Sequence, residues 1–184
     1  MIKKFSWLLL LLMTACAPWL PVGGPYESPS HRFSAVLPEK WMKLRADHDL
    51  LLSKDGPFLQ YVLIQERPID MPFEHTKKTL QRGMLANEAA QLIIDEISSD
   101  RCVHDFRVIE NRPARIKGQK AFELLFTHKN RDGLVFKTRY YGIISGDWFY
   151  AIRYNAAERY YFDKDIHAFE SILSSFELRE KKRG

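Results

Sequence analysis

Polar and hydrophobic residues alternate along much of the chain from residue 31 onward, with the period of two that is typical of half-buried β-strands. Phe33, Ala35 and Leu37 show this alternation at the start of the region. Six further segments are predicted as strands: 50–54, 58–68, 105–116, 120–128, 134–144 and 148–155. Turn-forming sequences separate them at Asp55-Gly56-Pro57, Asp132-Gly133 and Gly146-Asp147, and therefore predict hairpins.

The period changes between residues 73 and 100, where apolar positions step by four, three and four, as on one face of a helix. These positions are Ala86, Ala90, Ile93 and Ile97. Gly83 is expected to break this segment into two pieces. A second helix near the C-terminus is predicted from a face made of Ile166, Phe169, Ile172, Leu173 and Phe176. Strands, helix, strands and helix predict a single α+β domain, an antiparallel β-sheet flanked by helices.

The N-terminal sequence FSWLLLLLMTACAPW, residues 5–19, is the exception to this pattern because it opens with an unbroken apolar run. Lys3 and Lys4 supply a positive segment before it, as in a secretory signal. A spanning helix needs about 20 apolar residues, and this run meets Pro18 and Pro21 sooner. A cleaved signal is therefore favoured, with an uncleaved signal anchor as the alternative.

Residues 13–16, with the sequence MTAC, resemble a bacterial lipobox. The resemblance implies that residues 1–15 are a lipoprotein signal peptide. It also implies that Cys16 then carries a diacylglycerol and an acyl chain such as palmitate, which together anchor the protein to the membrane. Ala17, rather than Asp, as the second mature residue implies export to the outer membrane of the bacterial cell envelope, facing the periplasm.

The remaining chain divides by composition. Residues 16–30 contain Cys16 and a Pro/Gly/Ser-rich stretch that reads as a linker. Extended at about 3.1 Å per residue, it would hold the domain on the order of 40 Å from the membrane. The domain is expected at 31–178. A basic tail follows at 179–184, either solvated or in weak contact with anionic lipid headgroups.

Composition excludes few functions. The chain is 46% hydrophobic and 13% aromatic, which is enough to form a core. Its small excess of basic side chains does not indicate nucleic-acid binding. With Cys16 committed to lipid, Cys102 is the only other thiol. Burial is the more common fate of a free cysteine, so we expect Cys102 to be buried, with a reactive thiol as the alternative.

Three segments resemble the PsbP-like superfamily, which is named for an extrinsic subunit of photosystem II and contains many bacterial lipoproteins. They are RFSAVLPEKW at 32–41, RYYGIISGDWFYAIRYNA at 139–156 and FESILSSFEL at 169–178. The resemblance implies an α/β/α sandwich and a non-catalytic adaptor or assembly factor. It implies no shared active site.

No motif in the sequence indicates a particular reaction. The six histidines show no HExxH spacing, and a lone remaining cysteine cannot build a Cys-rich zinc site. His48 lies between two carboxylates in the sequence ADHD, but adjacent side chains on a strand point to opposite faces. A surface loop is therefore favoured over a metal site. We expect no metal, no cofactor and no enzymatic activity. A deep cleft gathering titratable side chains, such as Glu123 with His128, would favour an enzyme.

Turn chemistry predicts which residues share a face of the aromatic meander. A two-residue turn at Gly146-Asp147 pairs Tyr140 with Arg153, and one at Asp132-Gly133 pairs Leu125 with Tyr140. These registers place Glu123, Tyr140 and Arg153 on one sheet face. That face is the candidate ligand or partner site. Arginine can bind an anionic or planar group there, with Glu123 beside it. A cross-strand ion pair at the rim of a packed helix is the alternative.

An anchor, a linker and one compact domain together predict a membrane-tethered envelope lipoprotein that binds a protein partner or helps to assemble a complex. A periplasmic small-ligand-binding module that uses Glu123, Tyr140 and Arg153 is the alternative function. An uncharacterised enzyme is the second alternative.

Overall fold

The computed structural model describes residues 18–45 and 49–179, and in these ranges it consists of one antiparallel sheet with a helix on each face. The sheet has nine strands in the order β1-β2-β3-β4-β8-β7-β6-β5, and β9 pairs with β2. The strands are β1 (Trp19–Glu27), β2 (Phe33–Leu44), β3 (Leu50–Ser53), β4 (Gln60–Pro68), β5 (His104–Ile116), β6 (Gln119–Lys129), β7 (Val135–Ser145), β8 (Trp148–Ala157) and β9 (Glu177–Leu178). The helices are α1 (Ala86–Ser98) and α2 (Tyr161–Ser175).

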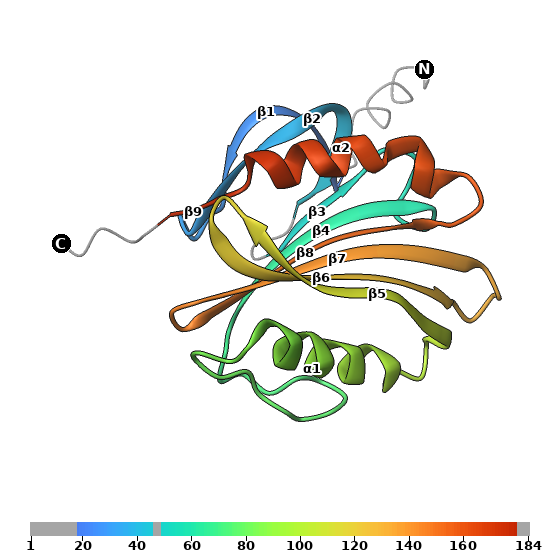
Figure 1. Cartoon of the computed structure of the whole chain (residues 1–184). Helices are drawn as coiled ribbons and strands as arrows, with labels where there is room; N and C mark the ends of the chain where they lie inside the picture. Colours follow the sequence, from blue (N-terminus) through green and yellow to red (C-terminus); the bar gives the residue numbers. More distant parts are fainter. Residues whose placement is uncertain (1–17, 46–48, 180–184) are drawn as a thin grey trace, which may run out of the picture.

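The sheet separates two core layers, each covered by one helix. Figure 1 shows α2 above the sheet and α1 below it. The α2 layer contains the larger cluster of buried side chains, among them Trp41, Tyr154 and Phe169. The α1 layer buries Ala90 and Ile93 against aromatic side chains of the sheet. The predicted α+β fold, with helices flanking an antiparallel sheet, is confirmed.

Helix α1 occupies only the second half of the segment predicted to be helical. Gly83 has a φ of +76°, and the chain before it forms turns rather than a first helical piece. One of these turns is closed by the Phe73 N–H, which donates to the Lys78 carbonyl at 2.8 Å. The helix begins after Leu85, whose backbone N–H donates to the Glu88 carboxylate at 2.9 Å. Gly83 therefore belongs to the turns before the helix, and the piece of the segment that precedes it is not helical.

The predicted linker over 16–30 is wrong for most of its length, because Trp19–Glu27 form the edge strand β1. This strand pairs with β2 from Trp19 opposite Leu44 to Glu27 opposite Ser34. Its prolines are tolerated because an edge strand needs only one row of hydrogen bonds, and a register shift lies between Val22 and Gly24. The domain therefore begins at least twelve residues before the predicted boundary at 31, and the predicted 40 Å reach does not apply.

One predicted register of the meander is confirmed and the other is wrong. Across the Gly146-Asp147 turn, Tyr140 lies opposite Arg153, as predicted. Across the preceding hairpin, however, Tyr140 lies opposite Leu124 rather than Leu125. The loop there is longer than two residues. Within it, the Asn130 side-chain oxygen accepts hydrogen bonds from the backbone N–H groups of Asp132 and Leu134. This Asn-centred loop shifts the pairing by one residue, which turns every side chain of β6 to the opposite face.

Candidate functional site

The shifted register separates the three predicted site residues. Glu123 lies opposite Tyr141, on the face covered by α2. Tyr140 and Arg153 lie opposite each other on the α1 face. Glu123 is 3% exposed and accepts a hydrogen bond from Arg112 Nε at 2.9 Å. Arg112 is its cross-strand partner on β5, so this carboxylate belongs to an ion pair with Arg112 and not with Arg153.

Arg139 extends this ion pair toward α2. Its guanidinium lies 3.5 Å from Glu123 and 3.2 Å from the helix residue Glu170. Burial, followed by the nearby Glu123 carboxylate, raises the pKa of Tyr141. The Glu123 network ties β5, β6, β7 and α2 together, which is a structural role.

Tyr140 and Arg153 line a cleft of about 510 Å³ on the α1 face, here called the polar cleft. It lies between the sheet, the C-terminal half of α1 and the loop that follows β4. Its lining residues are Tyr61, Gln65, Arg67, Phe73, Glu74, His75, Ile93, Glu96, Ile97, Asp100, Cys102, Val103, Phe126, His128, Thr138, Tyr140, Arg153 and Asn155. A volume of this size falls within the range of ligand-binding pockets.

Arg153 is the unusual group in the polar cleft. Its guanidinium lies 5.7 Å from the centre of the Tyr61 ring, and its buried Nε has no hydrogen-bond partner. Among the described residues, no carboxylate forms an ion pair with it. An unpaired guanidinium in a cleft is suited to a carboxylate or another anion, because its planar fork can donate two parallel hydrogen bonds.

The surroundings of Arg153 add further polar groups. Burial raises the pKa of Tyr140, although Arg153 and Arg67 act in the opposite direction. Burial, followed by the charge of Arg153, lowers the pKa of His128. The His128 ring is stacked on Phe136 at 5.6 Å, and its buried Nδ1 is unpartnered. The cleft thus offers a cation, a phenol and a neutral imidazole.

Two carboxylates that line the polar cleft accept hydrogen bonds from the backbone of neighbouring loops. Glu96 accepts hydrogen bonds from the backbone N–H groups of His75 and Thr76, at 3.0 and 2.9 Å. Asp100 accepts one from the Cys102 N–H at 2.8 Å. Both have a lowered pKa. These hydrogen bonds hold the rim of the cleft in place.

Cys102 is exposed, so the expected burial is wrong. The residue follows α1 in a turn on the surface and does not point into either core layer. Arg131 Nη2 donates to its Sγ at 2.8 Å. The apolar stripe of α1 ends at Ile97, so no periodic pattern reaches Cys102 from which its exposure could be predicted.

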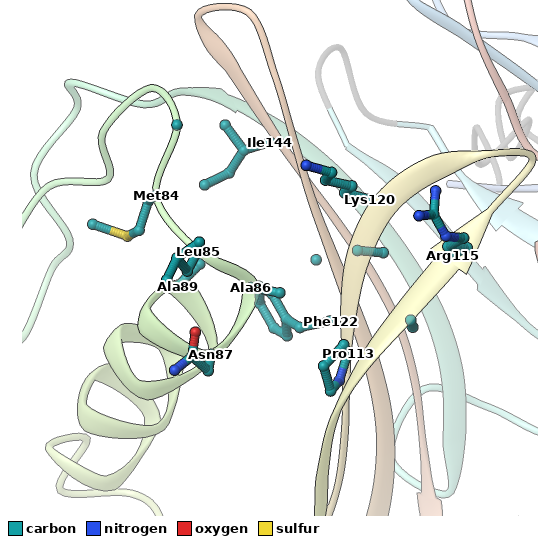
Figure 2. Close-up of a pocket in the computed structure, with 14 residues that line it drawn as sticks. Met84, Leu85, Ala86, Asn87, Ala89, Pro113, Arg115, Lys120, Phe122 and Ile144 are labelled. Atoms are coloured by element: carbon teal, nitrogen blue, oxygen red, sulfur yellow. The ribbon is translucent and has the colours of Figure 1, made fainter.

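A second cavity of about 500 Å³ lies at the opposite end of α1, here called the apolar cavity. It is lined by Gly83, Met84, Leu85, Ala86, Asn87, Ala89, Pro113, Ala114, Arg115, Lys120, Ala121, Phe122, Gly142 and Ile144. Figure 2 shows the first turn of α1 on one side and the β5–β6 hairpin on the other, with the Lys120 amine directed toward Ile144. None of these residues lines the polar cleft.

The predictions of a signal peptide at 1–15, of the Cys16 lipid anchor and of the position of His48 fall outside the described residues. The tail beyond Arg179 also lies outside them. Within the described ranges, no three His, Cys, Asp or Glu side chains gather closely enough to hold a metal ion. No helix in those ranges is both long and apolar enough to cross a membrane.

Tyr140 and Arg153 were predicted as site residues, and His128 was named only together with Glu123. The polar cleft residues Arg67, His75 and Glu96 were not identified from the sequence. Arg67 and His128 were strand residues without a motif, and His75 and Glu96 come from the segment around α1. The positions of Arg67 and Arg153 could have been predicted, because the alternation of polar and apolar residues along 58–68 and 148–155 assigns each side chain to a face of the sheet. The loop that brings His75 to the cleft has no such period.

Comparisons with known proteins support the fold and do not extend to a family. No family model matches the chain, and no curated protein sequence matches it. Yeast Mog1p, a Ran-binding protein of Saccharomyces cerevisiae, superposes with a TM-score of 0.58 at 11% identity, covering 86% of this chain and 96% of that one. Cyanobacterial PsbP (CyanoP) from Synechocystis gives 0.59 at 13% identity, covering 84% and 91%.

LpqN, involved in cell envelope biogenesis of Mycobacterium tuberculosis, gives a TM-score of 0.52 at 14% identity, with 88% of this chain and 91% of that chain covered. The likeness to CyanoP confirms the PsbP-like architecture that the sequence resemblance implied. At these identities the likeness concerns the fold alone.

Proposed function

We propose that this chain is a lipid-anchored, non-catalytic protein of the bacterial cell envelope whose polar cleft binds an acidic group of a partner protein. The observation that carries the proposal is Arg153, a guanidinium without a carboxylate partner among the described residues, next to Tyr140 in a cleft of about 510 Å³. An acidic side chain or a C-terminal carboxylate of a partner would pair with Arg153 and accept a hydrogen bond from the Tyr140 hydroxyl.

Three features support binding over catalysis. The Glu96 and Asp100 carboxylates are engaged by loop N–H groups, so they are poorly placed to act as a general base. Glu123 and His128, which in one cleft would favour an enzyme, lie on opposite sheet faces. The PsbP-like architecture is shared with Mog1p, which is described as Ran-binding, and with LpqN, which is described as involved in envelope biogenesis.

The placement of β1 changes the proposed tether. If Cys16 carries the lipid, only residues 17 and 18 separate it from Trp19. The domain would then lie against the membrane surface, and a partner of the polar cleft would be a membrane protein or another protein held at the same surface. We also propose that the protein is held at the outer membrane and faces the periplasm.

The test is photo-crosslinking in the native envelope, with a benzophenone amino acid at Glu74, an exposed residue that lines the polar cleft. We expect a protein adduct that Arg153→Ala abolishes and that Arg153→Lys weakens, because lysine cannot reproduce the bidentate fork. Arg159→Ala, which removes an exposed arginine outside the cleft, should leave the adduct intact. Circular dichroism and thermal unfolding of each variant check that the fold is retained.

Other results would replace the proposal. No protein adduct at position 74, or an adduct unchanged by Arg153→Ala, would show that the polar cleft does not bind the partner. A small carboxylate that is released from the purified wild-type chain, and is missing from Arg153→Ala, would support the small-ligand carrier. Turnover of a substrate that depends on His128 or Cys102 would support an enzyme.

A further inference from the structure

The apolar cavity has the features of an independent ligand site. Most of its lining is aliphatic or aromatic, contributed by the first turn of α1 and by strands β5, β6 and β7. Its volume of about 500 Å³ falls in the range of pockets for small organic ligands. Phe122 is 2% exposed and lies against Gly142 at the base of the cavity. An apolar group that entered the cavity would meet a hydrophobic floor.

Two positive charges lie at one side of this cavity without a negative partner. Arg115 on β5 lies directly opposite Lys120 on β6, and like charges in this position destabilise a sheet. Within the part of the chain that the structure describes, neither forms an ion pair with a carboxylate, whereas Lys117 in the same hairpin lies 3.7 Å from Glu177. Arg115 donates only to the Gly118 carbonyl, at 3.3 Å. Both side chains are exposed, and an anionic group at the mouth of the cavity would compensate their charge.

The beginning of α1 also lines the apolar cavity. Ala86 and Asn87, the first two helical residues, line the cavity. Backbone N–H groups in a first turn lack acceptors within the helix and carry the positive end of its dipole. The Glu88 side chain folds back to the Leu85 N–H and so caps the helix start. The helix start therefore lies across the cavity from Arg115 and Lys120, and the Glu88 carboxylate offsets part of its positive charge.

We infer that the apolar cavity binds a single-chain amphiphile with an anionic headgroup. The acyl chain occupies the apolar lining against Phe122, and the headgroup pairs with Lys120 and Arg115. A long-chain fatty acid and a lysophospholipid with an anionic headgroup share this chemistry. The inference is independent of the polar cleft, because the two sites have no lining residue in common.

The experiment uses the full-length protein in its own membrane and three photoreactive probes with the same acyl chain. The probes are a diazirine fatty acid, a diazirine lysophosphatidylglycerol and a neutral diazirine monoacylglycerol. Labelled peptides are mapped by mass spectrometry. We expect the anionic probes to label residues 84–89 or 120–122, and to do so more strongly than the neutral probe. Comparison of the two anionic probes identifies the preferred headgroup.

Charge and volume variants test the assignment. Arg115→Ser combined with Lys120→Ser should reduce labelling by the anionic probes about tenfold or more, with little change for the neutral probe. Lys117→Asn, which removes a charge from the same turn and tolerates its φ of +47°, is the matched control. Ala86→Trp should block all three probes by filling the cavity.

Equal labelling by anionic and neutral probes in the wild-type protein would overturn the headgroup assignment. Labelling confined to other peptides, or none at all, would overturn the site. Labelling that persists in a folded Ala86→Trp variant would also overturn the site. A melting temperature measured for each variant separates loss of the ligand from loss of the fold.

Discussion

The Phe122 ring lies directly against the backbone of Gly142, its partner on the neighbouring strand. The ring is held between Tyr140, at 6.0 Å and an interplanar angle of 10°, and Phe149, at 6.3 Å and 15°. A Cβ at position 142 would overlap the Phe122 ring and lie 2.9 Å from Phe149 Cε2. Glycine at this position therefore allows an aromatic row to pack flat on the α1 face, between the polar cleft and the apolar cavity.

Gly142→Ala should lower the free energy of unfolding by about 1–3 kcal/mol, the usual penalty for overpacking a core. The gain in strand propensity from alanine is smaller and does not offset the overlap. Urea unfolding measures the effect. Gly23→Ala is the matched control, since its Cβ would meet the flexible Glu39 side chain at 3.3 Å, and we expect a change within about 0.5 kcal/mol. Equal effects of the two substitutions would contradict the packing argument.

The Glu123 network predicts a second stability effect. Glu123→Ala should destabilise the fold by about 1–3 kcal/mol, because it removes the acceptor of the Arg112 hydrogen bond and leaves the partly buried Arg139 without a carboxylate inside the sheet layer. Glu170→Ala, at the exposed end of the same network, should change stability by less than about 1 kcal/mol. Thermal or urea unfolding distinguishes the two. If Glu170→Ala proved the more damaging, the surface contact would be the important one.

His128 predicts a dependence of stability on pH. Burial, with the charge of Arg153, lowers its pKa from the ordinary value of 6.5 in the folded protein. The unfolded chain therefore binds a proton at this histidine more readily than the folded chain. Its contribution to stability is complete above pH 6.5 and is lost as the pH falls through 6.5 toward the lowered folded pKa.

His128→Phe, which keeps an aromatic ring next to Phe136, should remove this part of the pH dependence. Urea unfolding between about pH 8 and about pH 5 should show a smaller loss of stability in the variant than in the wild type. Identical pH profiles would mean that His128 is protonated equally well in the folded and unfolded chains.

The sequence predicted the parts of this fold that depend on local pattern. The alternation in β4 and β8, the stripe of α1 and the two-residue turn at Gly146-Asp147 are short-range signals, and the α+β architecture follows from their order. β1 was missed because its composition is that of a linker. Its strand conformation depends on pairing with β2, which is not visible in the segment itself.

The prediction that Glu123, Tyr140 and Arg153 share one sheet face was wrong for a similar reason. One side-chain amide, that of Asn130, shifts the pairing of β6 with β7 by one residue. This shift places Glu123 on the face opposite Tyr140 and Arg153, although the assignment of those two residues to one face was correct. The loop from Phe73 to Leu85 contributes His75 to the cleft, and it has no periodic pattern from which its path could be predicted.

Lipidation of Cys16 is the prediction that determines where the domain is held. Intact-mass analysis of the membrane-extracted protein should show loss of residues 1–15 and the added mass of the acyl groups. Cys16→Ser should prevent both changes and release the protein from the membrane fraction. A Cys16→Ser chain that matures and fractionates like the wild type would exclude the anchor.

The position of β1 allows a second, more specific test of the lipid anchor at Cys16. Trp19 begins a strand that pairs with Leu44 at the edge of the sheet, so a lipid on Cys16 would hold this tryptophan close to the bilayer surface. Brominated phospholipids should quench its fluorescence in the lipidated protein. The quenched component should vanish in Trp19→Phe, whereas Trp41, which is 2% exposed in the core, should contribute none of it. Quenching that is absent in a protein shown by mass to be lipidated would mean that the domain stands away from the membrane despite the short connection.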